Sequence, residues 1–137
     1  DMMLAAKEGV DKSNNNPYLI AVTLLTSMDA NALKEIGLTS SVSDQVLNLA
    51  TTSGQAGLDG IVCSAKDIPI IKNKLPENFL YVTPGIRLRN IAKDDQKRVA
   101  TPFEAVEMGS NILVIGRPIT QAINPEAVIK EIINEIS

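Results

Sequence analysis

Histidine and tryptophan are absent from the 137 residues, and there is only one cysteine, Cys63. Without an imidazole the chain has no histidine-based catalytic triad, no histidine proton shuttle and no histidine-ligated zinc site. A single cysteine excludes an internal disulfide and a paired-cysteine site, and it fits a reducing, cytoplasmic compartment. Apolar runs stay well below the ~20 residues that a membrane-spanning helix needs, so no membrane association is expected.

Positive charge is also scarce, with 13 Lys and Arg against 16 Asp and Glu and a formal net charge of -3. A nucleic-acid surface needs clustered basic side chains for its phosphate contacts, so no nucleic-acid partner is expected. Apolar side chains are abundant, at 45% of the residues. At this length, that composition predicts a single globular domain over residues 1–137 with a buried core.

Short apolar runs alternate with amphipathic stretches along the chain. Four runs predict β-strands, at residues 18–25, 61–63, 79–83 and 111–115. The first run is continuous and rich in β-branched side chains, which is typical of a strand buried on both faces. Helices are predicted at residues 1–9, 29–37, 42–54, 65–74, 101–109 and 124–136. The alternation predicts an α/β fold with a parallel sheet, either open or part of a barrel.

The carboxyl ends of the strands are where parallel α/β folds gather their ligands. After the fourth run, Gly116 is followed by Arg117, which sets backbone N–H groups beside a guanidinium and suits a phosphate dianion. A tight turn with a solvated arginine is the alternative, and the pattern leaves both open. After the first run, Thr26 and Ser27 either hydrogen-bond a polar heterocycle or cap the next helix together with Asp29.

A long polar stretch, residues 84–100, follows the third run. Its basic residues are Arg87, Arg89, Lys93, Lys97 and Arg98. They either close over an anionic ligand as a mobile lid or form a solvated face. The Pro84-Gly85 pair has an explanation in turn geometry alone. Cys63 lies in a buried strand and is expected to behave as a small apolar residue.

Five motifs in order along the chain carry a family resemblance: Leu25–Met28 (LTSM), Gly57–Ser64 (GLDGIVCS), Val82–Arg87 (VTPGIR), Asp95–Arg98 (DQKR) and Val114–Thr120 (VIGRPIT). The sequence resembles the bacterial-type orotidine 5'-phosphate decarboxylases over essentially its whole length. The resemblance implies the C-terminal half, about four strands, of a TIM (β/α)8 barrel. It also implies conversion of orotidine 5'-monophosphate to uridine 5'-monophosphate in pyrimidine biosynthesis, by a homodimer that uses no cofactor and no metal.

Positions that match the family's motifs receive their expected roles from the resemblance. These are Thr26 and Ser27 for the pyrimidine, Pro84 for the base, Arg87 and Gln96 for the nucleotide, and Gly116 and Arg117 for the phosphate. Related barrels that act on ribulose or hexulose phosphates share the phosphate site. The Thr-Ser-Met and Asp-Gln-Lys-Arg motifs favour the pyrimidine nucleotide over those sugars.

The family's catalytic centre, an interleaved Lys-Asp-Lys-Asp array that comes partly from a D-x-K-x-x-D motif, is not found in this sequence. The neighbouring Lys and Asp residues are Asp11-Lys12 in a predicted loop, Lys66-Asp67 at a helix start and Lys93–Asp95 in the polar stretch. No catalytic residue is therefore predicted in this chain.

Four barrel strands leave two open edges, so a partner is expected, either the missing N-terminal half or a second copy. The alternative function is a non-catalytic half-barrel that self-associates and binds phosphate or nucleotide weakly.

We expect the purified 137-residue chain to show no decarboxylation of orotidine 5'-monophosphate, because no strand end supplies a catalytic lysine. The measurement is substrate consumption, with the intact mass of the chain checked in the same tube. Turnover at an enzymatic rate, with no longer chain present, would contradict the half-barrel interpretation.

Overall fold

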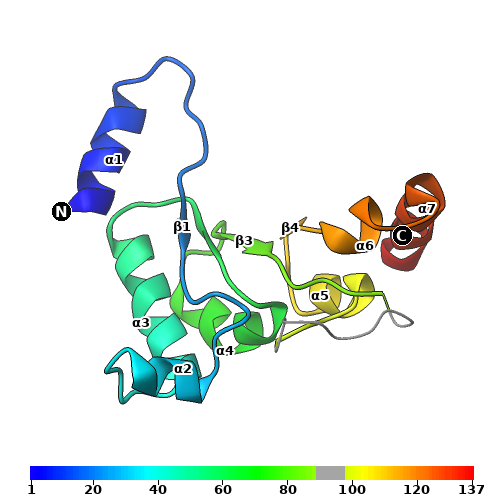
Figure 1. Cartoon of the computed structure of the whole chain (residues 1–137). Coiled ribbons are helices and arrows are strands. Elements are labelled where there is room, and N and C mark those ends of the chain that lie inside the picture. The colour runs from blue at the N-terminus through cyan, green and yellow to red at the C-terminus, as the bar shows by residue number, and fades with distance from the viewer. Residues whose placement is uncertain (89–97) are drawn as a thin grey trace.

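A parallel sheet of four short strands organises the chain (Figure 1). The structure is a computed structural model, and it describes residues 1–88 and 98–137. The strands are β1 (Ile20–Val22), β2 (Gly60–Val62), β3 (Leu80–Thr83) and β4 (Ile112–Leu113). They lie in the order β1-β2-β3-β4, each parallel to its neighbour. The predicted α/β fold with a parallel sheet is confirmed.

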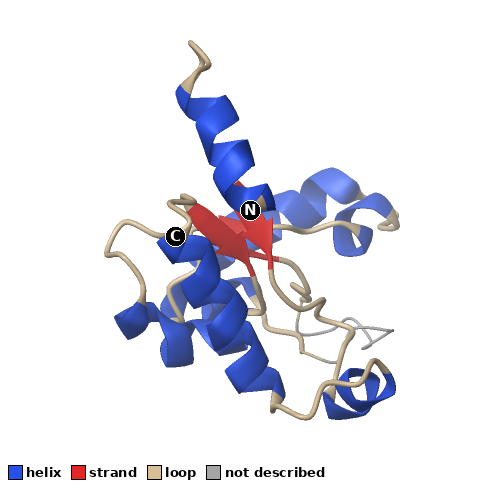
Figure 2. Cartoon of the chain, turned by 90° about the vertical axis from the view of Figure 1, so that its left-hand side faces the viewer, coloured by secondary structure: helices blue, strands red, loops and turns tan. Residues whose placement is uncertain are grey.

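Helices precede, connect and follow the strands, and several of them pack beside the sheet (Figure 2). They are α1 (Met2–Asp11), α2 (Ala30–Glu35), α3 (Val42–Gln55), α4 (Ile68–Ile71), α5 (Pro102–Glu107), α6 (Arg117–Thr120) and α7 (Pro125–Ile136), with the 3-10 turns η1 (Ala65–Asp67) and η2 (Lys72–Lys74) on either side of α4. The helix α1 continues through Gly9, which was expected to end it, so Asp11 is helical rather than in a loop. None of the described helices has the length and apolar character needed to cross a membrane.

Side-chain caps determine where several helices begin. The Asp29 carboxylate accepts hydrogen bonds from the N–H groups of Asn31 and Ala32, and so starts α2. At α5, Thr101 accepts from the Glu104 N–H, and the Glu104 carboxylate accepts from the Thr101 N–H. Such caps satisfy N–H groups that have no partner inside the helix, which is why the sequence predicted these starts correctly.

The main core lies where α3 and α4 pack against the sheet. Ile61 of β2 meets Val46 and Ala50 of α3 and Ile68 of α4, all of them fully buried. A smaller cluster forms beside it, composed of Ala65, Ile86, Ala100 and Ala105. Both clusters lie among the central elements, whereas α1 and α7 lie at opposite ends of the molecule (Figure 1).

The first strand is shorter and more exposed than the sequence predicted. The run at residues 18–25 was expected to be buried on both faces, but β1 spans only Ile20–Val22. Tyr18, Val22 and Leu25 are 75%, 60% and 59% exposed. In the part of the chain that the structure describes, β1 pairs with β2 alone, so its other edge has no strand neighbour. The exposed side chains of this run would be covered only by further protein packed against β1, which the described residues do not supply.

Gly60 allows β2 to approach β3 closely. A Cβ at this position would overlap the carbonyl oxygen of Leu80 and lie 2.7 Å from the Leu80 Cβ. Neither atom is the end of a flexible side chain, so the backbone of one strand would have to move. Only glycine fits at this point of the sheet.

We therefore expect Gly60→Ala to lower the free energy of unfolding by roughly 1–3 kcal/mol, the usual cost of overpacking. Gly9→Ala is the matched control, because Gly9 lies within α1 and nothing is within 4 Å of its Cβ position. That control should gain roughly 0.5–1 kcal/mol from better helix formation. Urea unfolding of both variants measures the difference, and equal effects would show that the contact between β2 and β3 is not tight.

Candidate functional site

The carboxyl ends of the four strands meet at one edge of the sheet, because the strands are parallel. The residues that follow those ends are Thr26 and Ser27 after β1, Ser64 after β2, Pro84 and Arg87 after β3, and Gly116 and Arg117 after β4. The fold therefore gathers at one edge six of the seven positions chosen from the sequence. The seventh, Gln96, lies outside the described residues.

Thr26 is buried and held from two sides. Its carbonyl oxygen accepts a hydrogen bond from the Arg98 N–H at 3.3 Å. Its side chain packs against Gly85, where a Cβ would lie 3.5 Å from the Thr26 Cβ and Cγ2. Gly85 also has a φ of +77°, a conformation that favours glycine. The ends of β1 and β3 are therefore in contact, and the half-buried Ser27 and Pro84 lie beside that contact.

Arg87 is buried rather than solvated. Its Nη1 donates to the Ile86 carbonyl at 2.8 Å, and its main-chain N–H donates to the Ala100 carbonyl at 3.0 Å. Ile86 and Ala100 form an isolated parallel β-bridge, so the two described ends of the polar stretch are paired with each other. A solvated charged face is thus wrong for Arg87. Arg89, Lys93 and Lys97 lie outside the described residues.

Arg98 forms a buried ion pair with Asp67 that the sequence did not predict, so a solvated face is wrong for Arg98 as well. Its Nη1 lies 2.8 Å from Oδ1 and 2.6 Å from Oδ2 of Asp67. Its Nη2 donates to the carbonyls of Leu24 and Leu25, each at 3.3 Å. Only 14% of the Arg98 side chain and 7% of the Asp67 side chain is exposed. The one available signal was the Ser-x-x-Asp pattern at Ser64, a helix-start motif that marks Asp67.

Gly116 and Arg117 form the turn from β4 into α6. The Gly116 carbonyl accepts from the N–H groups of Ile119 and Thr120, and Pro118 is buried in the first turn. Gly116 itself is exposed, and nothing lies within 4 Å of the position a Cβ would occupy. Packing therefore does not require glycine here, and the space beside its main chain is open. Arg117, half-buried, follows directly.

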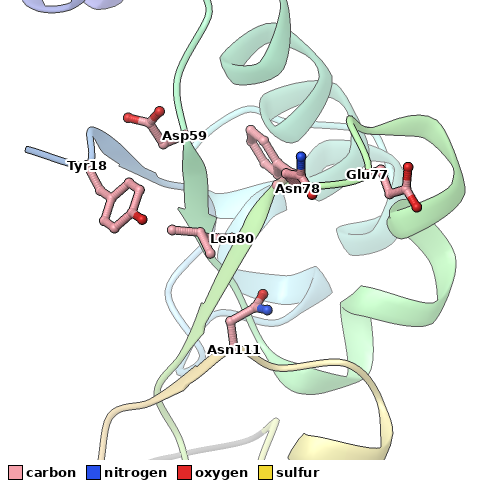
Figure 3. A pocket seen from close by; sticks show the side chains of 7 residues that line it. Tyr18, Asp59, Glu77, Asn78, Leu80 and Asn111 are labelled. Atoms are coloured by element: carbon pink, nitrogen blue, oxygen red, sulfur yellow. The ribbon is translucent and has the colours of Figure 1, made fainter. Parts of the chain in front are cut away.

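A separate polar cavity of about 480 Å³ lies at the opposite edge, where the strands begin (Figure 3). Its lining includes Tyr18, Asp59, Glu77, Asn78, Leu80 and Asn111. Two of these side chains already hold strand ends: Asp59 accepts from the Leu19 N–H at 2.7 Å, and Asn111 accepts from the Tyr81 N–H at 2.8 Å. These two side chains therefore stabilise the starts of the strands. In the described residues, no group of three or more acidic or cysteine side chains could hold a metal.

Cys63 is part of the core. The residue is fully buried beside Ile61 and Tyr81. Burial, followed by the nearby Asp67 carboxylate, raises the pKa of its thiol to about 12, although Arg98 acts in the opposite direction. The thiol therefore stays protonated at neutral pH and is a poor nucleophile.

The chain is similar in sequence to orotidine 5'-phosphate decarboxylases. The model of the "Orotidine 5'-phosphate decarboxylase / HUMPS family" matches residues 1–132. Relatives named orotidine 5'-phosphate decarboxylase include those of Nitrosococcus oceani, 52% identical, and Legionella pneumophila (strain Paris), 48% identical, each over 136 residues. These alignments cover 99% and 98% of the chain, which spans 59% of the length of each relative.

Solved structures agree with this result. The orotidine 5'-phosphate decarboxylase of Lactobacillus acidophilus matches with a TM-score of 0.80 and 36% identity, over 99% of this chain and 58% of that one. The corresponding enzyme of Pyrococcus horikoshii matches with a TM-score of 0.64 over 87% of this chain and 50% of that one. At 20% identity the second likeness concerns the fold alone. The predicted part-barrel is confirmed.

We expect the chain to lose stability as the pH rises above about 9. The Cys63 thiol has an ordinary pKa of 9.0 and a folded pKa of about 12, so it ionises first in the unfolded chain. Burial raises the pKa of Tyr81 in the same direction. Each group contributes stability that is complete below its unfolded pKa and is lost as the pH approaches its folded pKa. Urea unfolding between pH 7 and 10.5 tests this, and Cys63→Ala should show a shallower decline. An identical decline in both proteins would contradict the assignment.

Proposed function

Because the chain belongs to the orotidine 5'-phosphate decarboxylase / HUMPS family, we propose that it forms the nucleotide- and phosphate-binding part of an orotidine 5'-phosphate decarboxylase. The completed protein would convert orotidine 5'-monophosphate to uridine 5'-monophosphate. One observation carries the proposal: the strand-end residues that match the family's motifs come together at the carboxyl edge of a single parallel sheet. The cytoplasmic location expected from the composition remains a prediction.

The phosphate is assigned to the end of β4. Arg117 brings a permanently charged guanidinium, whose planar donors suit a phosphate dianion. The open space beside Gly116 lets an anion approach the main chain without meeting a side chain. Contacts to a phosphate far from the reacting carbon raise the catalytic rate only if they are stronger in the transition state than in the bound substrate. The proposal therefore gives this end of the sheet a share in catalysis as well as in affinity.

The pyrimidine is assigned to the ends of β1 and β3. Thr26 and Ser27 offer hydroxyl and main-chain groups that can pair with a polar heterocycle. Pro84 is half-buried beside them and offers a flat apolar ring for the base. Arg87 would contribute to nucleotide binding from a buried position. Gln96, assigned to the nucleotide by resemblance, remains a prediction because it lies outside the described residues.

The catalytic lysines and aspartates are assigned to a first half that these residues do not contain. The chain spans 59% of the relatives it matches. Both outer strands expose apolar side chains, with Val22 of β1 60% exposed, and with Ile112 of β4 and the adjoining Val114 each 47% exposed. Closure into a barrel would pair both edges and cover those side chains. We propose the first half as that partner, and a homodimer as the assembled form.

The alternative is a non-catalytic half-barrel that self-associates and binds phosphate or nucleotide weakly. The same exposed apolar side chains favour it, since a second copy would also cover them. Turnover after the first half is supplied separates the two functions, because self-association provides no catalytic lysine.

The test is a chimera in which the preceding segment of the Nitrosococcus oceani relative is joined to residue 1 of this chain. We expect the chimera to decarboxylate orotidine 5'-monophosphate. Arg117→Ala in the chimera should weaken binding of uridine 5'-monophosphate by about 1.5–3 kcal/mol, or roughly 10- to 150-fold, the scale of a charge-assisted contact.

Lys130→Ala is the control for Arg117→Ala. Lys130 is a basic residue on the exposed surface of α7, where it pairs with Glu126 at 2.8 Å, and such surface pairs contribute little to stability. Unchanged affinity in Arg117→Ala would mean that the phosphate assignment is wrong. A folded chimera that binds nucleotide without turnover would support the non-catalytic alternative.

A further inference from the structure

We infer that Arg98 is a positioning residue for the pyrimidine side of the site, which it holds in place through Asp67 and the end of β1. The inference rests on the proposed function, because it concerns how Thr26 is presented to a nucleotide. It assigns to Arg98 neither contact with the phosphate nor a proton-transfer step.

The side chain of Arg98 joins two strand ends that are far apart in sequence. Its guanidinium contacts both carboxylate oxygens of Asp67, which follows β2, at 2.6 and 2.8 Å. The same guanidinium donates to the carbonyls of Leu24 and Leu25, which follow β1. A planar guanidinium can serve both sets of acceptors at once from two nitrogens, whereas a lysine ammonium carries its three donors on a single nitrogen. The geometry of these contacts therefore suits arginine better than lysine, beyond the charge that the two share.

The main chain of Arg98 makes the same connection. Its N–H donates to the Thr26 carbonyl at 3.3 Å, and its carbonyl accepts from the Ser64 hydroxyl at 3.2 Å. Asp67 is held in turn, since it accepts from the Ser64 N–H at 3.2 Å. Thr26, Ser64, Asp67 and Arg98 therefore form one network across the carboxyl ends of β1 and β2.

Close packing transmits this network to the candidate substrate contacts. A Cβ on Gly85 would lie 3.2 Å from the Arg98 carbonyl oxygen and 3.5 Å from the Thr26 side chain. Gly85 directly follows Pro84, which is assigned to the base. A shift of Arg98 would therefore move both Thr26 and Pro84, two of the groups assigned to the pyrimidine.

The Arg98 charge is already engaged inside the protein. Only 14% of its side chain is exposed, and Asp67 lies within ion-pair distance of its guanidinium. A buried ion pair is weak grounds for stability, because removing both charges together is often neutral, but it can specify one arrangement of the groups around it. We expect Arg98 to act on the arrangement of the site rather than on phosphate affinity.

The experiment uses the chimeric barrel with Arg98→Met, Asp67→Asn, and both substitutions together. Each single variant leaves the other member of the pair buried without its ion-pair partner. Both the free energy of unfolding and kcat/KM should therefore fall, and kcat/KM should fall at least tenfold. The double variant removes both members of the pair. We expect it to recover most of the lost stability while kcat/KM stays at least tenfold low, because the links to the Leu24 and Leu25 carbonyls are still missing.

A second measurement compares inhibition by uridine 5'-monophosphate and by uridine. Arg98→Met should weaken both inhibitors by the same factor and leave their ratio unchanged, whereas Arg117→Ala should reduce the ratio. Lys12→Ala, which removes an exposed pair with Glu8 on α1, is the control for surface charge and should match the parent in all readouts.

Different outcomes overturn different claims. If the double variant recovers both stability and kcat/KM, the Arg98–Asp67 pair serves only stability, and the inference is overturned. A reduced nucleotide-to-nucleoside ratio in Arg98→Met would show that Arg98 serves the phosphate, and would overturn it as well. A folded parent chimera without turnover would overturn the proposed function itself, and the inference with it.

Discussion

Parallel pairing of four very short strands is the constraint on which the rest of the structure depends. Strands of two to four residues form few ladder hydrogen bonds, so side chains hold them at both ends. Asp59 and Asn111 accept main-chain N–H groups where the strands begin. Thr23 donates to the Val62 carbonyl at 2.8 Å where β1 ends. Because all strands run the same way, their carboxyl ends lie at one edge of the sheet, where parallel α/β folds bind their ligands.

The arginines at that edge differ in how deeply they are buried. Arg87 and Arg98 lie inside the protein, where their guanidinium groups contact carbonyls and a carboxylate. Arg117 is half-buried and directly follows Gly116, a glycine that packing does not require. The contacts of Arg87 and Arg98 give these two arginines a structural role, whereas the proposed phosphate role of Arg117 rests on its position after β4, beside Gly116.

The exposed apolar side chains share one physical origin. Val22 and Ile112 belong to the outer strands of the sheet, and Val114 follows β4. Residues of parallel strands are normally covered on both faces, so their sequences are apolar throughout. In the part of the chain that the structure describes, that cover is incomplete. The clearest case is the run at residues 18–25, which is almost entirely apolar although several of its side chains are exposed. The family relationship accounts for it, since the relatives are longer.

The sequence by itself determined the α/β class, helix starts such as those at Asp29 and Thr101, and the order of the strands that the candidate site residues follow. Those features are local: a cap at Asp29 or Thr101 depends on side chains within three residues. The exposure of β1 and the burial of Arg87 and Arg98 were decided only by the tertiary structure. Asp67 and Arg98 are 31 positions apart, and Arg98 and Leu24 are 74 apart. No local pattern encodes such contacts, because they exist only once parallel pairing has brought the strand ends together.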